Sequence, residues 1–434
     1  MNATHLSAVL SALLALIAAG EPAASAPQES GDHESAQPMT AEALVEWVMD
    51  ANPGLAAAGA AAESAAYRIE PAGSLEDPML SYDVAPLTAG ADRSLHQSIA
   101  VSQQIPWPGT LAAREAAARH ESVGVARDAD SLRLQIVAQA KSAHAEWRYI
   151  GAAMDVHHGT RALLDDLLAT VETRYAAGDA RRQDVLQAEL EFADLEDHLL
   201  RLVQERSAIQ ARINGLLNRA PGAPLPPAAP ITLESPPPSF EGLQALALAH
   251  HPELSRLNAE LAASEIRITL AEKAFFPNFQ VGVGYNAMWE SVDQRPMIGI
   301  SINVPLDRGK RRADLDRARA ETRRARFALS ARRSQLLADL ATARAEAVQA
   351  RQSVTLYRER LAPLAAQYLD AAIADYRSGA GTFLSVITAE QRKLEADLEL
   401  ARALSDYATR RAELERWVGG SLAAALPTAA GTES

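Results

Sequence analysis

The feature that most constrains the fold of this chain is an internal duplication. Its two halves carry the same landmarks in the same order, and equivalent residues are offset by 199 positions at the first landmarks and by 201 at the last. Self-similarity of this kind predicts two copies of one structural unit. The paired landmarks are Asn52-Pro53-Gly54-Leu55 with His251-Pro252-Glu253-Leu254, Pro78 with Pro277, Ile105-Pro106 with Val304-Pro305, Tyr175-Ala-Ala-Gly178 with Tyr376-Arg-Ser-Gly379, and Val185-Leu-Gln-Ala-Glu189 with Val386-Ile-Thr-Ala-Glu390.

Each half predicts the same succession of a helix, two strands, a very long helix, a turn and a second long helix. We expect repeat 1 over 40–219 and repeat 2 over 240–419, joined by a Pro-rich linker over 220–239. The expected elements are strands at about 79–86, 95–106, 278–288 and 297–305, and long helices at about 111–177, 182–217, 310–377 and 383–418.

The predicted strands alternate between apolar and small polar residues. In 298–305 the even-numbered residues are isoleucine or valine, whereas Gly299, Ser301 and Asn303 lie between them. Strands of 8–11 residues with one apolar and one small polar face are typical of membrane β-barrels. A half-buried sheet in a soluble sandwich is the alternative.

The predicted long helices carry apolar residues, with Arg206 as one charged exception, at alternating steps of three and four, which is the spacing of coiled-coil packing. A helix from residue 111 to 177 would be roughly 100 Å long at 1.5 Å per residue, too long for a compact domain. The predicted seams are Ile136, Ala140, Ala143, Trp147, Ile150 and Met154; Val185, Ala188, Phe192, Leu195, Leu199, Leu202, Arg206, Ile209, Ile213 and Leu216; and Leu336, Leu340, Ala343, Ala347, Ala350, Val354, Tyr357, Leu361, Leu364, Tyr368 and Ala371.

A proline-containing joint separates each second strand from its long helix. Pro106 and Pro108 cannot donate to a strand ladder, and Gly109 permits a sharp turn. We expect Pro305 and Gly309 to do the same in the second repeat.

The termini are expected to lie outside the two repeats. An apolar run at 6–19 followed by small residues predicts a signal peptide over 1–26, cleaved after Gly20 or Ala26. A disordered linker over 27–39 would follow, and 420–434 would form a flexible tail.

Composition excludes several classes of function. The net charge of −13 argues against nucleic acid as a partner, and the absence of cysteine excludes disulfides and thiolate metal sites. Neither a catalytic set of side chains nor a nucleotide-binding loop is recognisable, so we expect no enzyme and no cofactor. His157-His158 is a weak metal candidate, because adjacent residues on a helix face different directions.

Four strands cannot close a membrane barrel, because such barrels begin at about eight strands. An open sheet in lipid would leave unpaired amides that cost several kcal/mol each. If these strands lie in a membrane, several chains must therefore contribute to one barrel.

The duplicated Asn/His-Pro-x-Leu helix starts, Phe276-Pro-x-Phe279, the Gln-Gln-Ile-Pro-Trp-Pro-Gly exit and the two Tyr-x-x-Gly turns resemble the TolC-type outer-membrane efflux protein family. The resemblance implies a mainly α fold with a small β part. It also implies a homotrimer whose twelve-stranded barrel crosses the outer membrane of a Gram-negative bacterium and continues as a long α-helical barrel in the periplasm.

The implied function is that of a passive exit duct loaded by a periplasmic adaptor protein and an inner-membrane pump. The Pro-Trp-Pro-Gly element is most similar to the heavy-metal branch of the family, which makes a proton-driven RND-type pump and metal-cation cargo the candidates. An exported coiled-coil scaffold without channel activity is the alternative.

The resemblance also assigns candidate sites at the periplasmic tip. Tyr175, Gly178, Tyr376 and Gly379 would dock the adaptor. The positions expected to line the narrowest aperture are Asp184, Ser385 and Thr388, although the family often has carboxylates where the two hydroxyl residues stand.

Overall fold

The computed structural model describes residues 38–85, 96–286 and 295–422. The predicted signal peptide and most of the predicted linker and tail lie outside these ranges. The first half contains α2 (Ala41–Ala51), α3 (Pro53–Tyr67), α4 (Ile69–Gly73), β1 (Met79–Ala85), β2 (His96–Ile105), α5 (Thr110–Ala176) and α6 (Arg182–Leu216). The second contains α7 (Phe240–His250), α8 (Pro252–Lys273), β3 (Phe279–Asn286), β4 (Pro296–Ile302), α9 (Arg308–Leu356), a π-helix (Tyr357–Leu361), α10 (Ala362–Ser378) and α11 (Phe383–Val418).

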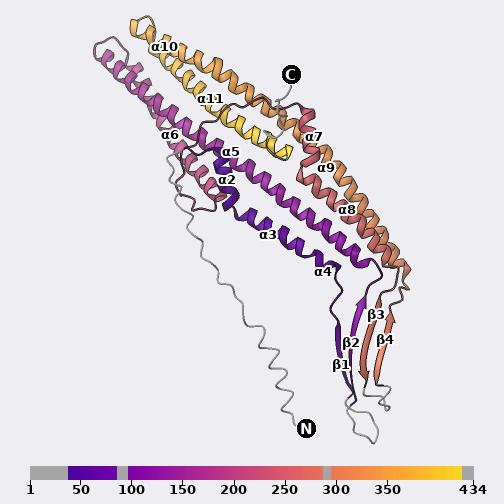
Figure 1. Ribbon diagram of the computed structural model, residues 1–434. Helices are drawn as coiled ribbons and strands as arrows, with labels where there is room; N and C mark the ends of the chain where they lie inside the picture. Colours follow the sequence, from indigo (N-terminus) through magenta and orange to yellow (C-terminus); the bar gives the residue numbers. More distant parts are fainter. Residues whose placement is uncertain (1–37, 86–95, 287–294, 423–434) are drawn as a thin grey trace, which may run out of the picture. The chain divides into compact units, whose positions relative to one another are not determined.

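The four strands form one antiparallel sheet in the order β1-β2-β3-β4. The two repeats meet at its centre, where β2 pairs with β3. Within the described residues, β1 pairs only with β2 and β4 only with β3. Each outer strand therefore keeps one edge without a partner (Figure 1).

The long helices continue the order of the strands. Next to the sheet, α5 packs between α3–α4 and α8, and α8 packs against α9. Farther along, α5 packs between α6 and α11, and α11 contacts α9 and α10 (Figure 1). Repeat 1 thus lies beside repeat 2 along the whole length of the helices. The outer sides of the outermost helices contact no other element of the described chain. None of the described helices combines the length and apolarity needed to cross a membrane.

The residues of the first two predicted seams are mostly buried. Ile136, Ala140 and Ala143 of α5 pack with Ile209 and Ile213 of α6 in one cluster that also takes up α2. The equivalent cluster of repeat 2 joins α7, α9 and α11. Alanine at many of these positions lets the helices approach closely.

The third predicted seam is wrong beyond Tyr357, which is half-buried and packs against the cluster that contains Val354. Leu361, Leu364 and Tyr368 are exposed, whereas Leu369 and Ala372 are buried. The π-helix between α9 and α10 explains the difference, because its wider turn takes up one extra residue and shifts every later core position by one.

The π-helix also explains part of the increase in the offset between equivalent residues of the two repeats, from 199 to 201. Ile136 and Leu336 occupy equivalent buried positions 200 residues apart, whereas Gly178 and Gly379 end equivalent helices 201 residues apart. The extra residue therefore lies in the π-helix. Pro363 follows directly, and its missing N–H falls where the α-helical bonding pattern is already interrupted.

The π-helix yields a test by single-residue deletion. Removing Glu359 from this turn should restore an ordinary α-helical turn and leave the core positions on both sides in place. Removing Ala347 should rotate one part of the helix by 100° relative to the other and misplace several buried residues, which would cost at least about 4 kcal/mol. Thermal unfolding followed by circular dichroism should show a near-normal transition for the first variant and a large loss for the second. Equal losses would contradict this explanation of the shift.

Candidate functional site

The sheet has one apolar and one polar face. The register places Tyr82 opposite Ile99, Ile99 opposite Tyr285, and Val283 opposite Ile298, so apolar side chains continue across all four strands. Many of them are exposed, as shown by 85% for Ile298. The other face carries Met79 and Met297 and otherwise small and polar residues, namely Ser81, Asp83, Ser98, Ala100, Ser102, Gln280, Gly282, Gly284, Gly299 and Ser301.

An exposed apolar face of this kind requires an apolar environment, because soluble surfaces rarely present contiguous apolar patches of such extent. On the polar face, Ser98 donates a hydrogen bond to Asp83 at 3.2 Å and Gln280 donates to Ser102 at 2.9 Å. The sheet therefore has the two-sided character that the sequence predicts.

The first strand-to-helix joint is held by an aromatic cluster and by Gly109. Trp107 stacks on Phe276 with ring centroids 4.7 Å apart, and its backbone N–H donates to the Asn278 side chain at 3.2 Å. Gly109 has φ of 78°, as its predicted turn requires, and Lys273 donates to the carbonyl of Pro108 at 3.0 Å.

The second joint differs from the prediction. Gly309 lies inside the first turn of α9 and is not among the residues with positive φ. The helix start is set by Asp307 instead, whose carboxylate accepts from the N–H of Lys310 at 2.9 Å. Because an acidic N-cap replaces the turn glycine, Pro305 and Gly309 do not reproduce the geometry of Pro108 and Gly109.

The two Tyr-x-x-Gly turns reverse the chain at the ends of the long helices. Gly178 and Gly379 have φ of 84° and 81°, a conformation that glycine adopts without strain. Open space surrounds both. Tyr175 is 48% exposed but Tyr376 is buried, so within this chain only three of the four predicted docking residues are accessible.

The three predicted aperture residues have local hydrogen bonds. The Asp184 carboxylate accepts from the N–H of Arg181 at 3.2 Å, which caps α6. Ser385 donates to the carbonyl of Thr382 at 2.6 Å, and Thr388 donates to that of Leu384 at 2.9 Å. These contacts account for the residues as parts of helix starts, and their place in an aperture stays a prediction.

An arginine that the sequence analysis did not single out joins the two hairpins at the tip. Arg174 of α5 lies over the Tyr376 ring at 4.6 Å and donates to the Tyr376 carbonyl at 3.0 Å. Burial raises the pKa of the Tyr376 hydroxyl, while the nearby Arg174 opposes that change. The turn of repeat 2 is thus fixed to the long helix of repeat 1.

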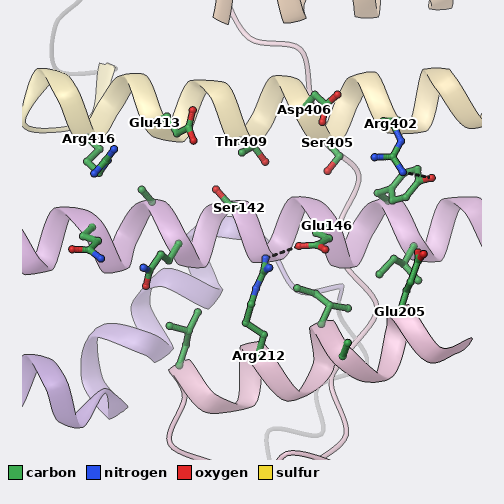
Figure 2. A pocket seen from close by; sticks show the side chains of 18 residues that line it. Ser142, Glu146, Glu205, Arg212, Arg402, Ser405, Asp406, Thr409, Glu413 and Arg416 are labelled. Atoms are coloured by element: carbon green, nitrogen blue, oxygen red, sulfur yellow. Dashed lines mark hydrogen bonds and ion pairs between the residues drawn. The ribbon is translucent and has the colours of Figure 1, made fainter. Parts of the chain in front are cut away.

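A groove of about 1110 Å³ runs between α6 and α11, with α5 as its floor (Figure 2). Its lining carries charges of both signs. Arg212 forms an ion pair with Glu146 at 2.5 Å, and Arg402 donates to the Tyr149 hydroxyl at 3.0 Å. The groove is open and is lined by apolar side chains as well as by polar ones that water can solvate, so it is not a closed ligand pocket.

The groove lies on the side of α5 that faces away from α2 and the inter-repeat linker. His144 contacts the Met39 carbonyl and Trp147 donates to the Pro226 carbonyl, which places α2 and the linker on one side. Ser142 and Tyr149 line the groove, and each is two residues away from one of those contacts. Two residues along an α-helix correspond to a rotation of about 200°, which gives nearly opposite directions.

A separate cavity of about 150 Å³ lies farther along α5, towards the tip. Glu390 of α11 lines it and is only 3% exposed, and its Oε1 has no hydrogen-bond partner. Burial raises the pKa of this carboxyl to about 7, and the neighbouring Glu191 adds to the effect. In the sequence, Glu390 is distinguished only as the end of a duplicated landmark, because its local pattern does not differ from that of the exposed Glu189.

His157 and His158 do not form a shared site. His157 is buried and stacks on His198 of α6 with ring centroids 5.6 Å apart, whereas His158 is exposed. Burial lowers the pKa of His157. Among the described residues, no group of three or more His, Cys, Asp or Glu is placed to hold a metal ion.

Comparison with known proteins gives consistent matches. The family model described as outer membrane efflux protein matches residues 243–420. The toluene efflux pump outer membrane protein TtgF of Pseudomonas putida is 27% identical over 207 residues, which are 46% of this chain and 42% of TtgF. The chain therefore matches less than half the length of this curated relative.

Solved structures match over more of the chain. The outer membrane protein VceC from Vibrio cholerae has a TM-score of 0.76 at 21% identity, covering 88% of this chain and 96% of its own. CusC has a TM-score of 0.76 at 16% identity, covering 93% and 99%. These matches confirm the predicted fold class, mainly α with a small β part, and the resemblance found in the sequence.

The raised pKa of Glu390 predicts how stability depends on pH. The folded chain binds this proton more tightly than the unfolded chain, so the free energy of unfolding should fall as pH rises from about 4.5 to about 7. The loss should be about 3 kcal/mol at most. Glu390→Gln should remove this part of the pH dependence, whereas Glu395→Gln, at an exposed position of the same helix, should not. Denaturant unfolding at pH 5 and pH 8 would measure it, and identical pH profiles for all three proteins would contradict it.

Proposed function

We propose that this chain is a member of the outer membrane efflux protein family, whose model matches residues 243–420, and that it is the outer-membrane channel of a tripartite efflux system. In this proposal the sheet contributes to a barrel in the outer membrane of a Gram-negative bacterium, and the long helices extend into the periplasm. The chain conducts passively, and a periplasmic adaptor and an inner-membrane pump supply cargo and energy.

The observation that carries the proposal is the sheet. One face is apolar and exposed, the opposite face is polar, and both outer strands have an unpaired edge. In lipid, every backbone amide needs a partner, so the edges must be paired by other copies of the chain. Three copies would give twelve strands, with the apolar face towards lipid and the polar face towards water.

The contact between the repeats supplies a template for the contact between copies. Within the chain, β2 pairs with β3 so that Ser102 lies opposite Gly282. Shifting both positions by the repeat offset of 199 places Ser301 of one copy opposite Asp83 of the next. The same operation places α9 of one copy against α3 and α4 of the next, as α5 packs against α8.

The charges of these surfaces are complementary. Residues 308–333 of α9 contain eleven Lys and Arg but three Asp and Glu, whereas 53–78 contain four Asp and Glu and one Arg. Arg267 forms an ion pair with Glu121 within the chain. The offset of 199 before the joint turns Arg267 into Arg68, and the offset of 200 between α5 and α9 turns Glu121 into Glu321 of a neighbouring copy. Both Arg68 and Glu321 are exposed in the single chain.

In this proposal the pump determines which substance is transported. The curated relative TtgF belongs, by its name, to a toluene efflux pump, so apolar solvents join metal cations as candidate cargo. A proton-driven RND-type transporter is the candidate pump. The polar groove opposite α2 would face the duct, because α2, α7 and the linker would obstruct it if they lay inside.

A cysteine pair tests the contact between copies. The natural chain has no cysteine, so any disulfide must come from introduced residues. Oxidised Asp83→Cys/Ser301→Cys should run as a covalent trimer on a non-reducing gel, because directly opposite residues of an antiparallel pair have Cβ atoms about 5 Å apart. Asp83→Cys/Ile300→Cys is the matched control, since it places the second thiol on the other face of the strand. Monomers from both variants would contradict the trimer.

Single-channel recording tests the duct itself. The purified protein in a planar bilayer should give discrete conductance steps. If three Asp184 carboxylates line the aperture, Asp184→Asn should lower the preference for K⁺ over Cl⁻ without abolishing conductance, and an unchanged preference would remove Asp184 from the aperture. Silence together with release from membranes by alkaline carbonate would favour the coiled-coil scaffold instead.

A further inference from the structure

The cavity beside Glu390 has the features of a built polar site. It lies between α5 and α11, with Leu369 of α10 as one of its apolar walls. Its polar lining consists of Glu390, Thr160, Lys393 and Asp397. Glu390 is almost completely buried, yet one carboxylate oxygen has no hydrogen-bond partner, which is uncommon for a buried polar atom.

The charged side chains around the cavity include more carboxylates than cations. Lys393 is engaged by Asp397 at 2.5 Å. The nearest charge from α6 is the carboxylate of Glu191, which accepts a hydrogen bond from Gln391 and repels an ionised Glu390. From α5 the Thr160 side chain lowers the pKa of Glu390 without adding charge, and Leu369 of α10 adds none.

The cavity opens on the same side of α5 as the large groove. Tyr149 lines the groove and Val156 and Leu163 line the cavity, at steps of seven residues along one row of the helix. If the chain is a duct, as proposed above, this row faces the duct.

We propose that the Glu390 cavity is a cation-binding site of the duct wall, which takes a partly hydrated divalent cation. The site offers the free carboxylate oxygen of Glu390 and the hydroxyl of Thr160, and waters complete the coordination. Hard divalent cations of the Mg²⁺ type are held in this way, by one or two carboxylates with several retained waters.

Proton competition gives the site a distinctive signature. The pKa of Glu390 is about 7 without a cation, so at pH 8 the carboxylate is mostly ionised and at pH 6 mostly protonated. Apparent affinity for a divalent cation should therefore fall about tenfold between pH 8 and pH 6. Surface carboxylates remain ionised across this range and should show no such change.

Binding of Mn²⁺, a paramagnetic probe for such sites, tests the proposal on the full-length protein in detergent. Electron paramagnetic resonance in 150 mM salt should detect one saturable site per chain with the tenfold pH dependence. Glu390→Gln should abolish it, whereas the exposed control Glu395→Gln should keep it. Thermal unfolding would verify that both variants are folded.

Two results would overturn the proposal: no saturable site in the natural protein, or a site that survives Glu390→Gln. The measurement does not depend on conductance or on trimer formation. Silence in the bilayer together with carbonate release, but with intact Mn²⁺ binding, would thus refute the duct and keep the cation site. Conductance without Mn²⁺ binding would keep the duct and refute the cation site.

Discussion

The structure depends on one constraint, which is that a strand edge cannot remain unpaired away from water. Each missing backbone hydrogen bond in an apolar environment costs several kcal/mol. The four-stranded sheet has an apolar face that needs such an environment and two edges that cannot tolerate it alone. The duplicated sequence resolves the conflict in the proposed trimer, because a chain whose two halves already pair with each other can pair with its copies in the same way.

A duplicated chain needs only one kind of contact surface, used both within and between copies. The helices obey the same rule as the strands, since α5 packs against α8 and α11 of the other repeat along its whole length. Repeat 2 has two extra residues relative to repeat 1, and each lies where the chain can accommodate an additional residue. One lies in the joint before α9 and the other in the π-helix, and both leave the core positions on either side aligned.

Features with a strong local signal could be predicted from the sequence. The alternation in 298–305 gives the strand faces, the seven-residue spacing from Ile136 gives the seam, and Gly178 gives the turn. Features that depend on a contact between distant segments could not. The pairing of His157 with His198 requires the alignment of α5 on α6, and the exposure of Leu364 requires knowing that a π-helix precedes it.

Contacts between copies and contacts between the two repeats of one chain differ in where their charged groups lie. The order of folding and assembly explains the difference. Surfaces that would meet between copies, such as the Arg-rich start of α9, remain solvated in the single chain, so their charges cost little before assembly. Buried polar groups such as Glu390 lie instead where the two repeats meet within the chain. Covalent linkage makes that contact intramolecular, and its packing energy can offset an unsatisfied carboxylate. The equivalent Glu189 of repeat 1 is exposed in the single chain, because in the proposed trimer the repeat offset converts the contact around Glu390 into a contact between copies.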